Sequence, residues 1–157
     1  MRLWHKDLIP VLPYKQLVAQ WRELCAIAGS IDKHGTPNHL LVNKVLDYPP
    51  LHLIIYTNAV IEEMHKRGYD VSEKAYSEMA TRLARNINRF DMHTYMYVPN
   101  GLSDIYRDWH NDRYFIQCYC NLQEKYDCGG ISKEDWDKID NFGKKGKENE
   151  STLQELS

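Results

Sequence analysis

The chain has 157 residues, of which 43% are hydrophobic and 27% charged, and a formal net charge of −2; this length suits one domain around one core. Eleven tyrosines and four tryptophans exclude a chain that is disordered throughout, and no apolar run approaches the roughly 20 residues that span a bilayer. The first residues lack the apolar stretch of a signal peptide, so we expect a cytoplasmic protein with no membrane partner.

Helical periodicity dominates the first half of the chain. Leu17, Trp21 and Leu24 recur on one helical face, and Pro13 suits a first helical turn. Glycine and proline pairs separate the periodic segments. We predict helices over residues 13–30, 39–47 and 51–67, and a fourth that begins at Asp70 or Ser72 and ends near Phe90.

The second half continues with helices after a predicted loop at 91–108, which contains Pro99 and has no clear period. A helix is expected over 112–127, and a short one starts at Ser132. No strand is indicated, so the predicted fold class is all-α. We assign residues 1–140 to a single compact helical domain and 141–157 to a flexible, disordered polar tail.

Basic residues concentrate in the amino-terminal third of the chain. Residues 1–44 contain six Lys or Arg against three Asp or Glu, whereas residues 60–140 contain eleven against fifteen. DNA attracts proteins through its phosphates. The amino-terminal third is therefore the part that would receive a nucleic acid, although the net charge argues against binding by charge alone.

Neither the cysteines nor an Asp-His-Asp alternation predicts a metal site. Cys118 and Cys120 point about 200° apart on a predicted helix and cannot share one ion, so we expect reduced thiols, mostly in the core. Asp108, His110 and Asp112 could ligate a metal, but a surface turn is the favoured interpretation. We expect no metal and no cofactor.

Glu23 lies on the polar face of the first predicted helix. At 100° per residue it falls almost opposite the apolar centre, with Ala19 and Ala26 one turn away on either side. A solvated polar face is the simplest interpretation. The two alanines, however, leave room for a ligand or another backbone beside the carboxylate.

Two stretches of sequence resemble a known family. LIPVLPYKQLVAQWREL, followed by AGSIDKH, resembles the start of the phage-type pyrimidine-dimer DNA glycosylases, the endonuclease V family, and VIEEMHKRGYDV resembles a helix end in the same proteins. The resemblance covers about the first 70 residues. It implies a DNA-repair enzyme that acts on damaged bases, pyrimidine dimers or related, in double-stranded DNA. We expect a monomer.

The resemblance also implies roles for individual residues. Enzymes of this family use the α-amino group of the chain as nucleophile, and the bulk of Arg2 should block methionine removal, which leaves Met1 in this role. α-Amines are neutral at physiological pH more often than lysines are. Glu23 matches the family's essential carboxylate, which would stabilise a cationic sugar. The expected activity is glycosylase with associated AP-lyase chemistry.

The predicted DNA-binding residues are Arg2, Lys15, Arg22, Lys33 and His34. Arg22 matches a residue that holds backbone phosphate in the family. Lys33 and His34 follow the first predicted helix and would either contact phosphate or form a solvated turn.

Some positions depart from the family, and other interpretations stay open. Leu3 and Ala26 stand where the family has arginines, and Gln16 where it has a histidine. A non-enzymatic DNA-binding or interaction protein that kept the fold is the alternative. The aromatic residues of the second half would be core residues or would stack on DNA bases: Trp109, Tyr114, Tyr119, Tyr126 and Trp136.

Overall fold

The computed structural model describes residues 1–93 and 98–155, with side chains described to residue 144. These residues form helices and connecting segments without a strand, so the predicted all-α class is confirmed. In chain order the elements are η1 (Lys6–Val11), α1 (Tyr14–His34), η2 (Val42–Asp47), α2 (Pro50–Lys66), α3 (Glu73–Arg85), η3 (Ile87–Arg89), η4 (Leu102–Asp104), α4 (Asp112–Asp127) and α5 (Lys133–Glu155).

Helix α1 is longer than the sequence predicts. Gly29 and Ser30 continue the helix, and it ends at Gly35, whose φ of 78° is left-handed and whose N–H donates to the Ile31 carbonyl at 2.8 Å. A glycine inside a helix costs only about 1 kcal/mol, and the extension buries Ile31 completely. Lys33 and His34 therefore belong to the last turn of α1, which corrects the prediction that they follow the helix.

The next elements differ from prediction mainly in length. Helix α2 begins at Pro50 and is followed by left-handed Gly68, close to the predicted bounds. Ser72 caps α3 by accepting a hydrogen bond from the Ala75 N–H. The predicted helix to Phe90 is wrong, because α3 ends at Arg85 and the short 3-10 turn η3 follows. The short helix predicted over 39–47 is the 3-10 helix η2, which covers only Val42–Asp47.

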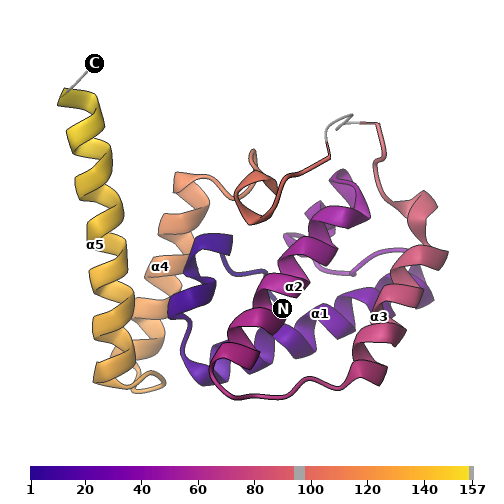
Figure 1. Ribbon diagram of the computed structural model, residues 1–157, viewed down its shortest axis with the longest axis horizontal. Coiled ribbons are helices and arrows are strands. Elements are labelled where there is room, and N and C mark those ends of the chain that lie inside the picture. Colours follow the sequence, from indigo (N-terminus) through magenta and orange to yellow (C-terminus); the bar gives the residue numbers. More distant parts are fainter. Residues whose placement is uncertain (94–97, 156–157) are drawn as a thin grey trace.

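The helices pack in two groups joined by the amino-terminal arm, residues 1–12 (Figure 1). Helix α1 packs against α2 and α3, and α4 packs against α5. Between the groups, η1 contacts both α2 and α5. The arm thus lies between the two helix groups, while Met1 itself is exposed.

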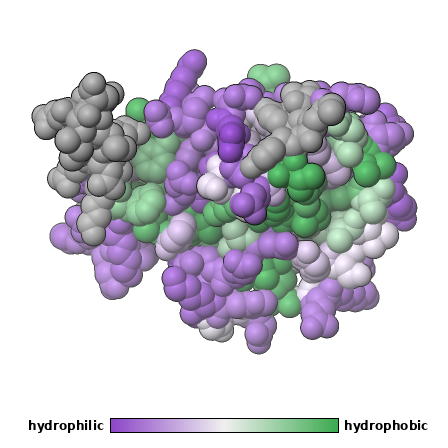
Figure 2. Space-filling model, turned by 45° about the horizontal axis from the view of Figure 1, so that its top comes forward, coloured by the Kyte–Doolittle hydropathy of each residue, from purple (hydrophilic) through white to green (hydrophobic). Residues whose placement is uncertain are grey.

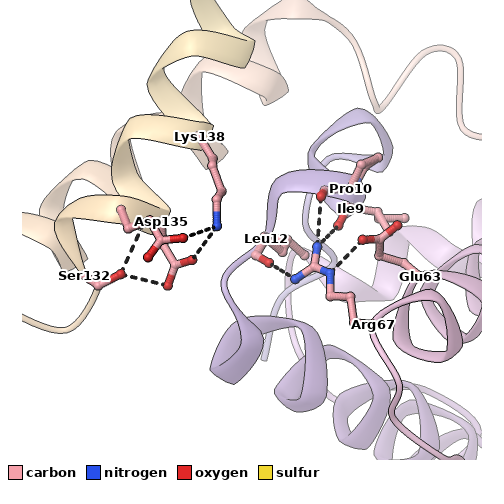
Figure 3. A network of polar contacts seen from close by, with 9 residues as sticks. Ile9, Pro10, Leu12, Glu63, Arg67, Ser132, Asp135 and Lys138 are labelled. Carbon is pink, nitrogen blue, oxygen red and sulfur yellow. Dashed lines mark hydrogen bonds and ion pairs between the residues drawn. The ribbon is translucent and has the colours of Figure 1, made fainter.

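Arg67, just after α2, fixes η1 from one side (Figure 3). Its guanidinium donates to the carbonyls of Leu12 at 2.6 Å and Pro10 at 2.8 Å, and its Nε donates to Glu63 at 2.6 Å. From the other side the Lys6 ammonium donates to the carbonyls of Ser103 and Ile105. Burial lowers the pKa of Lys6.

A single hydrophobic core joins residues from the whole described chain, including Leu3, Leu24, Tyr56 and Leu122, all fully buried. On the face drawn in Figure 2, hydrophilic side chains surround hydrophobic ones that reach the surface. No helix within residues 1–93 and 98–155 is long and apolar enough to cross a membrane.

Several predictions about the second half need correction. His110 is not in a surface turn but is 5% exposed, and its Nδ1 accepts the Lys6 N–H at 2.9 Å. In the described part of the chain, no three side chains of metal-binding type come together. Cys120 and Cys128 are exposed rather than in the core, and all four cysteines are free.

The aromatic residues of the second half divide between core and helix interface. Trp109 and Tyr114 are 4% exposed, as a core position predicts. Tyr126 stacks on Trp136 with ring centroids 5.4 Å apart, and the Tyr119 hydroxyl donates to Asp140, so both pairs join α4 to α5.

The sequence predicted a short helix here, but α5 runs continuously from Lys133 to Glu155. Its backbone passes residue 140 without a break. The boundary between a domain at 1–140 and a tail at 141–157 stays a prediction, and Leu156 and Ser157 lie outside the described residues.

Candidate active site

Glu23 lies near the middle of α1 and away from its buried face. Leu17, Leu24 and Ile27 on that face are fully buried, whereas the Glu23 side chain is 31% exposed. Ala19 and Ala26 are exposed on either side of it, as the helical wheel predicts. The carboxylate therefore stands at the surface, with a small alanine one turn away on either side of it.

The start of the chain folds back onto this carboxylate. The Met1 α-amine nitrogen lies 3.9 Å from Glu23 Oε1, and the Arg2 backbone N–H donates to Glu23 Oε2 at 3.0 Å. The two oxygens thus face the first two residues of the chain. An amine so held has its nitrogen beside a group that can accept a proton.

Gln20, one turn before Glu23, fixes the path of the arm. Its Oε1 accepts hydrogen bonds from the Trp4 N–H at 2.8 Å and the Tyr56 hydroxyl at 3.0 Å, while its Nε2 donates to the Arg2 carbonyl at 3.0 Å. The Tyr114 hydroxyl donates to the Leu3 carbonyl. Complete burial raises the pKa of Tyr56 well above its usual value, so this hydroxyl stays a donor.

These contacts leave an open pocket of about 260 Å³ over the amine, which we call the amine pocket. Its lining comes from the arm, from one face of α1 and from α4: Met1, Arg2, Trp4, Lys15, Gln16, Ala19, Glu23, Asn121 and Lys125. Glu23 is the one acidic residue of this lining, against three basic ones. An anionic ligand is therefore favoured at the rim, and the carboxylate stands beside the α-amine.

The predicted DNA-binding residues do not all gather at this pocket. Arg2 and Lys15 line it, and the Arg2 guanidinium lies 5.5 Å from the centroid of the Trp4 ring. Arg22 is exposed on α1 next to Glu23 but is not part of the lining. Lys33 and His34 are exposed about 15 Å farther along the helix axis.

Three residues of this site were not predicted from the sequence. Lys125 and Asn121 come from α4, about a hundred residues after the arm, and no local pattern indicates that α4 reaches the amine. Gln20 is fully buried. A polar side chain on the apolar face of a helix is the signal that could have singled it out, because a buried amide needs hydrogen-bond partners.

Comparison with known proteins agrees with the resemblance seen in the sequence. Residues 1–77 match the family described as pyrimidine dimer DNA glycosylase. Neither the curated proteins nor the solved structures gave a match. The matched segment contains the arm, α1 and α2, and thus both Met1 and Glu23. Over residues 1–77, which include the arm and the whole of α1, the chain is therefore similar to the pyrimidine dimer DNA glycosylases.

Proposed function

We propose that the protein is a DNA glycosylase with an associated AP-lyase activity, and that it acts on damaged bases, pyrimidine dimers or related lesions, in duplex DNA. The observation that carries the proposal is the Met1 α-amine 3.9 Å from the Glu23 carboxylate, in an open pocket with a basic rim. The family match supports the substrate class.

In the proposed reaction the neutral Met1 amine attacks C1′ of the damaged nucleotide. The glycosidic bond breaks, and its electron pair leaves with the base, which takes up a proton. Loss of a proton from nitrogen and opening of the sugar ring give an imine. The imine acidifies the 2′ hydrogen, and its removal expels the 3′ phosphate and breaks the strand.

Glu23 would act in two of these steps. Its negative charge stabilises the cationic sugar as the base departs. Its oxygens, which face the amine, can take the proton that nitrogen releases. Arg2, Lys15 and Arg22 would hold backbone phosphates around the reacting nucleotide, with Lys33 and His34 farther along α1. The proposal involves no metal or cofactor.

Borohydride trapping tests the nucleophile. On a duplex with one abasic site, borohydride should reduce the imine and link the protein to DNA, and selective acetylation of the α-amine should abolish the adduct. Lys15→Arg and Lys125→Arg are the matched controls, because both lysines line the same pocket. Trapping that survives acetylation and disappears in one of these variants would assign the nucleophile to that lysine.

The alternative function is DNA binding without catalysis. Titration of abasic, dimer-bearing and undamaged duplexes separates the two. A repair enzyme should prefer damaged DNA, since extruding a nucleotide costs least where pairing is already weak. Equal affinity for all three, with no cleavage, would favour the binding protein.

A further inference from the structure

A second pocket adjoins the amine pocket along the first turns of α1. Its volume is about 380 Å³, and its lining includes Tyr14, Gly130 and Ile131. Lys15 and Gln16 line both pockets. A ligand that extends from the amine pocket past Ala19 into the second pocket would therefore contact these two side chains.

Gln16 has an unsatisfied hydrogen-bond acceptor at this place. Its Oε1 is buried and has no partner among the described residues. Gln20, one turn later, uses both ends of its amide to hold the arm. Turning the Gln16 oxygen toward a ligand would break no protein hydrogen bond, and the last torsion of a glutamine is soft.

The chemistry of DNA restricts what this oxygen can bind. Phosphate and sugar oxygens of an intact strand only accept hydrogen bonds, whereas base edges carry N–H donors beside acceptors. A glutamine amide matches such an adjacent pair with its own oxygen and N–H groups. The unsatisfied acceptor therefore fits a base edge rather than the backbone.

The position of Gln16 indicates which base this is. Gln16 and Glu23 are seven residues apart on α1, about 10 Å along the axis, and the small Ala19 is the residue of α1 that lies between them in the lining of the amine pocket. With C1′ at the Met1 amine, a base directed along α1 would lie over Ala19 and present its far edge to Gln16. We infer that Gln16 binds the edge of the base that is removed and helps to select it, an inference that rests on the proposed function.

The test compares a substrate with and without the base. Gln16→Leu and wild type are assayed on a duplex with one cyclobutane thymine dimer and on the same duplex with an abasic site. Loss of the base contact should lower the rate of glycosidic-bond cleavage at the dimer by about tenfold and leave abasic-site cleavage unchanged. Gln123→Leu, an exposed glutamine of α4 outside both linings, is the matched control and should change neither rate.

The other outcomes overturn the inference in distinguishable ways. Equal losses on both duplexes, or no loss on either, would make Gln16 a structural or neutral residue while the proposed function stands. Wild type that cleaves abasic DNA but breaks no glycosidic bond at the dimer would also overturn it. No imine trapping and no cleavage by wild type would overturn the proposed function and this inference with it.

Discussion

At the scale of the residue, Glu23 joins the start of the chain to the middle of α1. It accepts the Arg2 N–H and faces the Met1 amine, and it is 31% exposed. Its contribution to folding is therefore small, because one partly exposed hydrogen bond and a 3.9 Å ion pair are worth about 1 kcal/mol or less. Its contribution to the proposed reaction is large, because it carries the negative charge beside the nucleophile.

We expect Glu23→Gln to lower turnover by at least about 10²-fold while DNA binding survives. The amide keeps the size of the side chain and can still accept the Arg2 N–H, but it has no charge for the sugar cation. The free energy of unfolding should change by less than about 1 kcal/mol. Single-turnover kinetics and thermal melting measure the two effects, and unchanged turnover would return Glu23 to a solvated surface position.

Arg22→Ala and Lys33→Ala should each weaken DNA binding and make the salt dependence shallower by about one phosphate contact. Both side chains are exposed on α1. Lys138→Ala on α5 is the matched control, because this lysine already pairs with Glu134 at 2.9 Å. Binding titrations at two salt concentrations check this, and three identical slopes would remove α1 from the DNA-binding surface.

At the scale of the element, the arm is held by partners from four other parts of the fold. Gln20 of α1, Tyr56 of α2, Tyr114 of α4 and Arg67 after α2 all bond to its backbone carbonyls or N–H groups. The arm has no helix of its own longer than η1. The position of the amine therefore depends on these side chains.

Arg67→Met should release η1 and lower activity together with stability. The substitution keeps the aliphatic stem and removes the guanidinium that three arm carbonyls and Glu63 share. We expect the free energy of unfolding to fall by about 2 kcal/mol. Lys66→Met, at a 77% exposed neighbouring position, should change it little. Denaturant titration of both variants measures these changes. Equal, small losses of unfolding free energy in the two variants would show that contacts other than those of Arg67 hold the arm.

How well the sequence predicts an element depends on whether local signals determine its ends. The bounds of α4 were predicted, because Asn111 caps its start and glycines follow its end. The end of α1 was not predicted, because the burial of Ile31 stabilises the longer helix by more than Gly29 destabilises it. The position of Glu23 followed from helical periodicity. The places of Asn121 and Lys125 could not be predicted, because packing between distant segments brings them to the amine.

At the scale of the whole molecule, the two helix groups meet around buried histidines. His5 and His110 are 3% and 5% exposed, and their rings lie 5.2 Å apart. His52, 2% exposed, accepts the Tyr106 N–H. Burial lowers the pKa of His52 to about 4 and that of His110 well below its usual value. These histidines are neutral in the folded protein at pH 7.

We expect stability to fall as the pH drops below about 6.5. The unfolded chain then binds protons that the folded chain excludes, which costs about 1.4 kcal/mol per pH unit for each such histidine. For His52 the loss continues until the pH nears its folded pKa of about 4. Above pH 6.5 both states are neutral and this contribution is constant.

Thermal melting between pH 7 and pH 5.5 measures this loss. His110→Asn keeps an acceptor for the Lys6 N–H but cannot be protonated, so its melting temperature should depend less on pH, whatever its value at pH 7. His34→Asn is the control, since His34 is exposed. Equal pH dependence in His110→Asn and wild type would contradict a neutral His110 in the fold.

The burial of the arm has a practical consequence for any work with the protein. Leu3 is fully buried, and the chain leaves the core at Met1, directly into the amine pocket. A peptide tag joined ahead of Met1 would convert the amine into an amide and would occupy the amine pocket. The other end of the described chain lies at the far tip of α5, at the edge of the molecule (Figure 1). Affinity tags and surface attachment therefore belong at the carboxyl end.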